Sequence, residues 1–429
     1  MHITKSAEKI TPFGGFNFCF KSFYDCGLAD LIDQHLGERV KTVGFSYSDI
    51  MANHMAIFLN GGDCTEDINE HLRGHLHQVK GMNVCSADTI LRGIKELSCE
   101  SVAMDNSASG VHHEFNVNAN LNDLMVKALR GTGQLDEGES YDLDYDNQVI
   151  ATEKWDAART YKKTYGYQPG IASIDNMPVY IEGRNGNSQA KYKQEQTLER
   201  AFENLASNHI SIGRFRADSA SYQKEVVEMV KSHCEWFYIR AKRSAGMVQK
   251  IGDLPAGSWT SVRLGLQKME VADLGDYRPF GGGTPYRLVV SRIKRADGQT
   301  DLFSGQSYTY RAILTNDVET PAEDIVDFYN KRGDSERLFD VMNNDFGWSR
   351  LPCSFLSENT AYMILSAIYA NFYRYLIGEY SKKVTWLKPA FRLKKFIFRF
   401  ITVAAKWIKT GRRHVLKLYT HKDYSPLLE

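Results

Sequence analysis

Apolar positions in the first 110 residues recur at helical spacing. We predict one helix with Ser48 as its N-cap and Gly61-Gly62 at its end, and a second helix capped by Ser86. The apolar positions of the second helix are Ile90, Leu91, Ile94 and Leu97. The pattern predicts a helical N-terminal region over residues 1–130. It suits a small DNA-binding unit or a packing subdomain, and composition alone slightly favours packing.

The pattern changes at residue 141, where strands begin. We predict a strand at 141–149, a hairpin of 170–174 and 177–181 that turns at Asp175-Asn176, a helix at 194–205, a strand at 209–217, a helix at 222–233 and a strand at 236–240. A three-stranded meander followed by alternating helices and strands is typical of a mixed α/β sheet. This α/β core occupies residues 141–243 in the prediction.

Helical periodicity is absent from 244–316, where glycine-rich turns separate short β-like runs, so we predict an all-β insertion there. The helical pattern returns at Thr320-Pro-Ala-Glu323, which has the form of a capping box with Pro at the first helical position. The predicted helix continues past Gly333 to Phe339. Residues 317–380 are therefore the predicted second part of the core.

Composition narrows the class of protein. The 429 residues include 53 Lys and Arg against 52 Asp and Glu, so the chain is not a polycation and any nucleic-acid site needs local segregation of charge. The seven cysteines include no Cys-x-x-Cys pair, and the N-terminus has no apolar signal segment, so we expect a cytoplasmic protein. The apolar stretch 359–373 is too short to cross a bilayer. We expect no membrane partner.

The end of the chain is strongly basic. Residues 391–417 contain nine Lys or Arg and no Asp or Glu. We predict a basic, helical C-terminal region at 381–429. Its cations favour contact with backbone phosphate over a simple solvated helix face.

Carboxylates occur at three places that suit metal chemistry. Asp142, Asp144 and Asp146 share one face of the predicted strand, where like charges repel unless a cation lies among them. Asp218 follows a strand at the edge of the sheet where ligands bind. Glu336 lies on the predicted helix beside Tyr329 and Arg332.

Hard oxygen ligands from separate elements suit Mg²⁺, and Arg332 suits a phosphate. Each carboxylate also has a plain interpretation: a solvated strand edge, a helix N-cap, or an exposed helix glutamate. A sharper alternative is a calcium-binding EF-hand-like loop from Asp142 to Glu153, although Asn147 stands where that loop needs Gly.

Taken in order, these segments resemble the DDE transposases of bacterial insertion sequences. They are most similar to the branch whose RNase H-like domain carries an all-β insertion and a Tyr-x₂-Arg-x₃-Glu-x₆-Lys signature. Tyr329, Arg332 and Glu336 match that signature, while Asn343 replaces its Lys, a place that Arg337 or Lys331 could take. Asp144-Tyr-Asp146-Asn-Gln148 resembles the strand of the first Asp, and Arg216-Ala-Asp218-Ser that of the second.

The resemblance implies a fold and a reaction. The fold is an RNase H-like mixed α/β sheet interrupted by the all-β insertion. Asp146, with Asp144 as the alternative, Asp218 and Glu336 would hold two Mg²⁺ ions, which Mn²⁺ could replace. The reaction would be metal-dependent hydrolysis at the transposon ends followed by strand transfer into target DNA.

The resemblance also implies partners. Tyr329 and Arg332 would position terminal phosphates. The helical N-terminal region would recognise terminal inverted repeats, and a homodimer would act on paired ends of double-stranded DNA. The further DNA contacts expected are Lys331, Arg337, Arg412 and Arg413. Two other classes stay open: a non-catalytic DNA-binding protein of the same fold, and a hydrolase that uses Asp142–Asp146 as paired acid and base.

Overall fold

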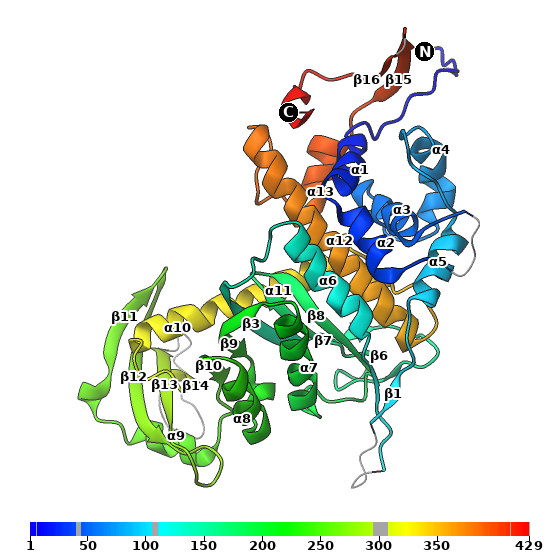
Figure 1. Cartoon of the computed structure of the whole chain (residues 1–429). Helices are drawn as coiled ribbons and strands as arrows, with labels where there is room; N and C mark the ends of the chain where they lie inside the picture. The colour runs from blue at the N-terminus through cyan, green and yellow to red at the C-terminus, as the bar shows by residue number, and fades with distance from the viewer. Residues whose placement is uncertain (6, 40–43, 105–109, 295–307, 412, 429) are drawn as a thin grey trace.

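The protein is a mixed α/β protein built on one large mixed sheet (Figure 1). The structure, a computed structural model, describes residues 1–5, 7–39, 44–104, 110–294, 308–411 and 413–428. The order of strands across the sheet is β1-β2-β8-β7-β3-β9-β10-β14-β13-β12-β11. These strands are β1 (Val102–Ala103), β2 (Glu114–Asn116), β3 (Ser140–Asn147), β7 (Gly170–Ile174), β8 (Met177–Arg184), β9 (Ser211–Ala217), β10 (Trp236–Arg240), β11 (Thr260–Leu264), β12 (Gln267–Tyr277), β13 (Tyr286–Lys294) and β14 (Tyr308–Thr315).

The centre of the sheet consists of β3, β9 and β10, which run parallel, while the flanking pairs are antiparallel. The predicted hairpin is confirmed: β7 and β8 are joined at Asp175 and Asn176, whose φ angles of 49° and 62° are those of a two-residue hairpin turn. A small separate sheet follows β3, which the sequence did not predict. Its strands are β4 (Ile150–Ala151), β5 (Ala158–Arg159) and β6 (Tyr165–Tyr167).

Helices cover both faces of the large sheet. One face packs against α7 (Gln194–Ser207), α8 (Lys224–His233) and α9 (Ala245–Gly252) through a core that includes Phe202 and Phe215. The opposite face packs against α10 (Ala322–Asn330) over the far strands and against α12 (Leu356–Lys383) near β8. The carboxylate-bearing side chains of β3 point to this second face.

The N-terminal helices share one hydrophobic core with α12 rather than forming a separate one. They are α1 (Phe16–Asp25), α2 (Leu28–Leu36), α3 (Tyr47–Leu59), α4 (Arg73–Leu76), α5 (Ala87–Glu96) and α6 (Ala119–Gly131). Ser86 caps α5 as predicted, but the cap of α3 is Ser46, not Ser48: Ser46 and Asp49 form a capping box, and the Ser48 hydroxyl instead donates to Asp33. Among the described residues, no helix is long and apolar enough to cross a membrane.

The predicted all-β insertion at 244–316 needs correction. The segment begins with the helix α9, where Ser244 caps the first turn. Its four strands do not form a sheet of their own, because β14 pairs with β10 and so extends the large sheet. The prediction missed α9 because a helix of eight residues is too short to establish a periodicity.

The predicted helical tail at 381–429 is also wrong. After α13 (Leu393–Phe396) and one π-helical turn, the chain forms a hairpin of β15 (Ala405–Thr410) and β16 (Arg413–Leu418). This hairpin lies beside the N-terminal segment, where Thr11 and Ala405 exchange backbone hydrogen bonds and Asn17 accepts one from Trp407. The two ends of the chain therefore form one unit.

The helix predicted from Thr320 through Phe339 is broken in two. A 3₁₀ turn, Lys331–Asp334, separates α10 from α11 (Ser335–Asp345). The predicted capping box is absent: Pro321 occupies the N-cap, and the Thr320 carbonyl accepts a hydrogen bond from Arg287. The 3₁₀ turn alters the helical phase, so Tyr329, Arg332 and Glu336 do not form one continuous stripe.

Candidate active site

Two of the three predicted carboxylates lie at the carboxyl ends of adjacent parallel strands. The register pairs Tyr145 of β3 with Ala217 of β9, and the next residues along these strands are Asp146 and Asp218. The side chains are close enough that the charge of Asp218 acts on Asp146. This arrangement follows from the parallel pairing of strands whose acidic residues are 72 positions apart.

Asp146 is held by groups from its own strand and from the segment after α10. Its Oδ1 accepts the backbone N–H of Asn147 at 2.8 Å, and its Oδ2 accepts from Arg332 Nη1 at 3.0 Å and from the Ser335 hydroxyl at 3.3 Å. Burial raises the pKa of Asp146, and Asp218 raises it further, while Arg332 opposes both effects. The site therefore favours an additional positive charge.

Asp218 caps a short 3₁₀ turn, Ser219–Ser221, as the plain interpretation of this residue predicted. Its Oδ1 accepts the N–H of Ala220 at 2.9 Å. The cap uses one oxygen of a half-buried carboxylate, and Oδ2 has no hydrogen-bond partner among the described residues. Capping and a second role as a ligand are therefore compatible at this position.

The segment from Tyr329 to Glu336 closes over these two carboxylates. The Tyr329 hydroxyl donates to the carbonyl of Ala217 at 3.0 Å, directly before Asp218. The Arg332 side chain lies largely buried between the segment and β3, and its Nε has no hydrogen-bond partner. Although burial opposes the charge of this guanidinium, Tyr329 and the two carboxylates raise the pKa of Arg332.

Glu336 lies next to the site without entering it. It occupies the first turn of α11, directly after Ser335, and its side chain is exposed. Among the described residues, Asp146, Asp218 and Glu336 do not form a group whose carboxylate oxygens all lie within 4.8 Å of one another. The structure thus brings two of the predicted carboxylates together and places the third beside them.

Asp142 and Asp144 have arginine partners of their own. Asp144 receives two hydrogen bonds of 2.7 Å from Arg216, and Asp142 receives bonds of 2.6 and 2.7 Å from Arg214. The EF-hand-like loop is therefore wrong: residues 140–147 form a strand, and two of the carboxylates that would bind calcium, Asp142 and Asp144, pair with arginines on β9. Both guanidinium groups lie over the ring of Phe328, at 3.9 Å from its centroid for Arg214 and 4.4 Å for Arg216.

One group of side chains in the described part of the chain has metal-compatible spacing, and the sequence did not single it out. Asp63, Cys64 and Asp67 place their ligand atoms within 4.8 Å. Backbone N–H groups of Asp63 and Cys64 already occupy one oxygen of Asp67, and Asp63 pairs with Arg350. These contacts account for the cluster as a capped turn.

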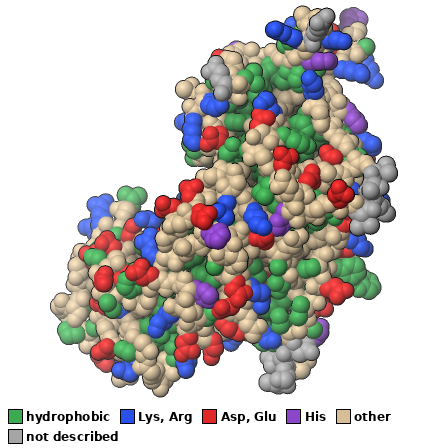
Figure 2. Space-filling view, viewed as in Figure 1, with side chains coloured by type: hydrophobic (Ala, Val, Ile, Leu, Met, Phe, Trp, Pro, Cys, Tyr) green, Lys and Arg blue, Asp and Glu red, His purple; other side chains and the backbone are tan. Residues whose placement is uncertain are grey.

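The predicted DNA contacts lie in different environments. Lys331 is exposed and pairs with Asp327 at 3.0 Å, and Arg337 lines a cavity between α11 and α12. Arg413 is exposed on β16, and Arg412 lies outside the described residues. Figure 2 shows Lys and Arg side chains gathered at the tip of the molecule that the hairpin forms. The cations of its strands are Lys406, Lys409, Arg413 and Lys417.

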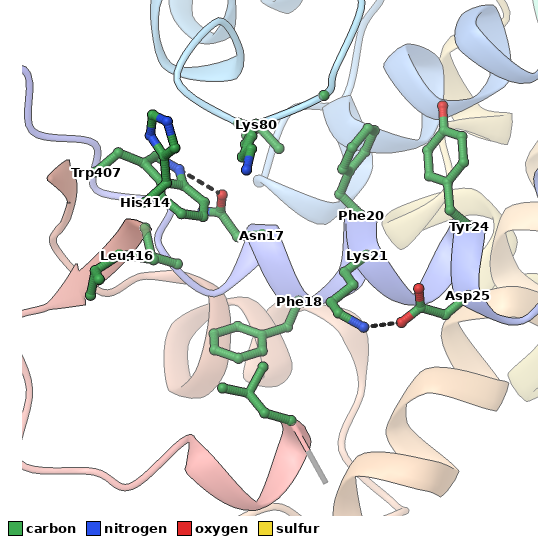
Figure 3. A pocket seen from close by; sticks show the side chains of 14 residues that line it. Asn17, Phe18, Phe20, Lys21, Tyr24, Asp25, Lys80, Trp407, His414 and Leu416 are labelled. Carbon is green, nitrogen blue, oxygen red and sulfur yellow. Dashed lines mark hydrogen bonds and ion pairs between the residues drawn. The ribbon is translucent and has the colours of Figure 1, made fainter. Parts of the chain in front are cut away.

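A cavity of about 660 Å³ lies away from the carboxylates, between α1 and the C-terminal hairpin. In Figure 3 aromatic side chains of α1, Phe18, Phe20 and Tyr24, lie on one side, and Trp407 of β15 lies on the other.

Sequence reasoning missed three residues of the site. Arg216 saturates Asp144 and also donates to the carbonyl of Phe328 at 2.7 Å, so it joins β3, β9 and α10. Ser335 donates to Asp146, and Arg240 ends the strand next to Asp218. The sequence could have indicated Arg216, because it lies two residues before Asp218 and therefore on the same face of the strand.

Comparison with known proteins gives one extensive match. A family model described as transposase DDE domain, group 1, matches residues 8–429. No curated protein matches the chain. The solved structures that match include the piggyBac transposase synaptic complex with hairpin DNA, at a TM-score of 0.41 and 11% identity over 91% of this chain and 79% of that one. Another is the Drosophila P element transposase strand transfer complex, at a TM-score of 0.25 and 12% identity over 54% and 48%.

Proposed function

The chain belongs to the family of transposases with a DDE domain of group 1, and from this premise we propose that it carries out cut-and-paste DNA transposition. Membership makes it a transposase, an enzyme of DNA transposition. The proposed reaction has two parts: hydrolysis of the phosphodiester at each transposon end, and attack of the freed 3′-hydroxyl on target DNA. We further propose that it is the transposase of a bacterial insertion sequence, of the branch with a β insertion.

The observation that carries the proposal is the position of Asp146 and Asp218. Two carboxylates at the ends of adjacent parallel strands, one with a pKa raised by burial and by the other's charge, provide hard oxygen ligands for a divalent cation. In the structure, the guanidinium of Arg332 supplies part of the positive charge beside Asp146. We assign the first carboxylate to Asp146 and not to Asp144, because Arg216 binds both oxygens of Asp144.

Asp146, Asp218 and Glu336 would hold two Mg²⁺ ions, which Mn²⁺ could replace. When bound, such ions supply a nucleophile at neutral pH and stabilise the leaving oxygen of an in-line displacement. The protein contributes orientation. Tyr329, fixed through its hydroxyl to Ala217, and Arg332 would position the phosphates of the transposon end.

The remaining regions would serve DNA binding. Residues 141–243 and 317–380 form the proposed RNase H-like core, and the helical N-terminal region would recognise the terminal inverted repeats. Exposed cations would contact backbone phosphates, which adds affinity without sequence information. They are Lys331, Arg337 and Arg413, and Arg412, which lies outside the described residues, is proposed as a further contact. We propose a homodimer on paired ends.

Cleavage of DNA that carries the ends of the element tests the proposal. Wild-type protein with Mg²⁺ should cut at the ends, and Asp218→Ala and Glu336→Ala should bind the same DNA without cutting it. Asp142→Asn is the matched control, because Asp142 pairs with Arg214 outside the site and should leave cleavage intact. Binding without cleavage by the wild type would instead support a non-catalytic DNA-binding protein of this fold.

A further inference from the structure

A third side chain reaches the edge where the two carboxylates lie. Strand β10 runs parallel to β9 on the side away from β3, and the register pairs Ile239 with Ala217. The residues that follow are Arg240 and Asp218. Arg240 is therefore the neighbour of Asp218 in the same way that Asp146 is, but on its other side.

Arg240 differs from the other arginines on this face of the sheet. Arg214, Arg216 and Arg332 each form an ion pair with one of the carboxylates of β3. Arg240 is half-buried, and no carboxylate of the described chain forms an ion pair with it. A half-buried guanidinium without a counter-charge is costly, so such a group marks a place where an anion binds.

The surroundings of Arg240 add positive charge. Burial lowers the pKa of Arg240; Tyr329 opposes this effect, while the charges of Arg311 and Arg332 act in the same direction as burial. Arg311, on β14, is exposed, and its guanidinium likewise has no ion-pair partner in the described part of the chain. Several cations thus converge where the acidic side chains of the site end.

A cavity reaches Arg240 and Arg311 from the side of the sheet that α9 covers, opposite to the side that α10 covers. It has a volume of about 180 Å³, and its wall combines the guanidinium-bearing residues of β10 and β14 with apolar residues of α9. The lining includes Arg240, Arg243, Tyr310, Arg311, Met247 and Ile251. A polar rim over an apolar floor suits a single phosphodiester, whose charged oxygens meet arginines while its sugar contacts apolar side chains.

We propose that Arg240 and Arg311 form a phosphate subsite beside Asp218, separate from the contacts of Tyr329 and Arg332. Neighbouring strands lie about 4.8 Å apart, so the subsite takes a backbone phosphate next to the one that reacts. The inference rests on the proposed function, since it names the DNA backbone as the anion. The subsite fixes the direction in which the DNA strand leaves the carboxylates.

A scan of single phosphates tests the subsite. Duplexes of the transposon end, each with one neutral methylphosphonate, are bound by the wild type and by Arg240→Gln, with Arg263→Gln as control because Arg263 is exposed on the edge strand β11. At one position next to the cleaved bond, the wild type should lose about tenfold in affinity, which is typical of a charged hydrogen bond. Arg240→Gln should bind unmodified DNA about tenfold less tightly and be insensitive at that same position.

Further variants and a cleavage assay complete the test. Arg311→Gln, a change at an exposed residue that leaves the fold intact, should lose sensitivity at the same phosphate, and Arg240→Lys should recover part of the affinity. A scan of Arg240→Gln with the wild-type pattern would overturn the subsite. Cleavage of the unmodified duplex by the wild type reports on the proposed function independently. If the wild type cleaves the DNA and the phosphate scans of the wild type and Arg240→Gln are the same, the subsite is refuted and the proposed function is not.

Discussion

Asp144 and Asp146 lie two residues apart on one face of β3, and each pairs with an arginine, yet the two pairs differ in kind. Arg216 gives two hydrogen bonds of 2.7 Å to Asp144 from the adjacent strand and a third to the carbonyl of Phe328. Arg332 gives one N–H to Asp146 from a 3₁₀ turn, and its Nε lacks a partner. We call a pair saturated when the arginine binds both carboxylate oxygens, and unsaturated when it gives the carboxylate a single N–H. A saturated pair between strands holds the sheet together, whereas the carboxylate of an unsaturated pair can exchange its arginine for another cation. Asp144, in the saturated pair, is therefore the structural carboxylate, and Asp146, in the unsaturated pair, is the candidate metal ligand.

The largest expected effect comes from breaking the saturated pair. Arg216→Met leaves the Asp144 carboxylate buried without a counter-charge, and removal of one partner of a buried pair costs about 3–5 kcal/mol. Urea denaturation should show this loss in the free energy of unfolding. The double variant Asp144→Leu/Arg216→Met should be less destabilised, and equal losses in the two proteins would contradict a saturated pair.

Breaking the unsaturated pair should affect catalysis more than stability. Arg332→Gln should reduce cleavage about 100-fold, equivalent to about 2.7 kcal/mol of activation free energy. Its free energy of unfolding should fall less than that of Arg216→Met, because the Asp146 side chain is 21% exposed and keeps its bonds from Asn147 and Ser335. Arg332→Lys keeps the charge but not the planar fork and should recover only part of the rate. A stability loss as large as that of Arg216→Met would remove the distinction between the pairs.

A smaller effect should appear in the pH dependence of stability without divalent cations. Burial and the charge of Asp218 raise the pKa of Asp146 in the folded protein above its unfolded value, so the folded state binds the proton more readily. Stability therefore falls as the pH rises through this raised pKa. Asp146→Asn, which carries no charge, should be more stable than the wild type at neutral pH, and the difference should shrink on acidification. Thermal unfolding in EDTA measures it, and a difference independent of pH would argue against this cause.

The smallest effect is expected at the outermost pair. Asp142 and Arg214 are 28% and 44% exposed, so water screens their attraction. Asp142→Asn should change the free energy of unfolding by no more than about 1 kcal/mol and leave cleavage unchanged. A larger loss of stability would mean that side-chain exposure does not predict how much each of the three carboxylate–arginine pairs contributes to the free energy of unfolding.

Local chemistry made part of this molecule predictable. The turn at Asp175-Asn176 and the cap at Ser86 follow from residues that are close in sequence. The partner of each carboxylate could not be predicted, because it depends on the register between β3 and β9, which are separated by several elements. Arg332 was predicted to contact a phosphate. In the structure its side chain donates a hydrogen bond to Asp146, a contact that the spacing of residues in the sequence does not predict.

The C-terminal hairpin was missed for a different reason. Its strands alternate in a period of two, with Arg413, Val415 and Lys417 on one side of β16, and Gly411, at a φ of 60°, makes the turn. That alternation was present in the sequence, but the density of positive charge suggested a basic helix. Charge describes what a segment can contact, while periodicity describes its conformation.

The hydrogen bonds between Thr11 and Ala405 bear on how the protein can be engineered. A deletion of residues 405–428 would also strip the backbone partner from the N-terminal segment, so loss of DNA binding in such a truncation could not be attributed to the missing cations alone. Charge-neutralising changes within an intact β15–β16 hairpin, such as Lys409→Gln and Lys417→Gln, separate the two causes.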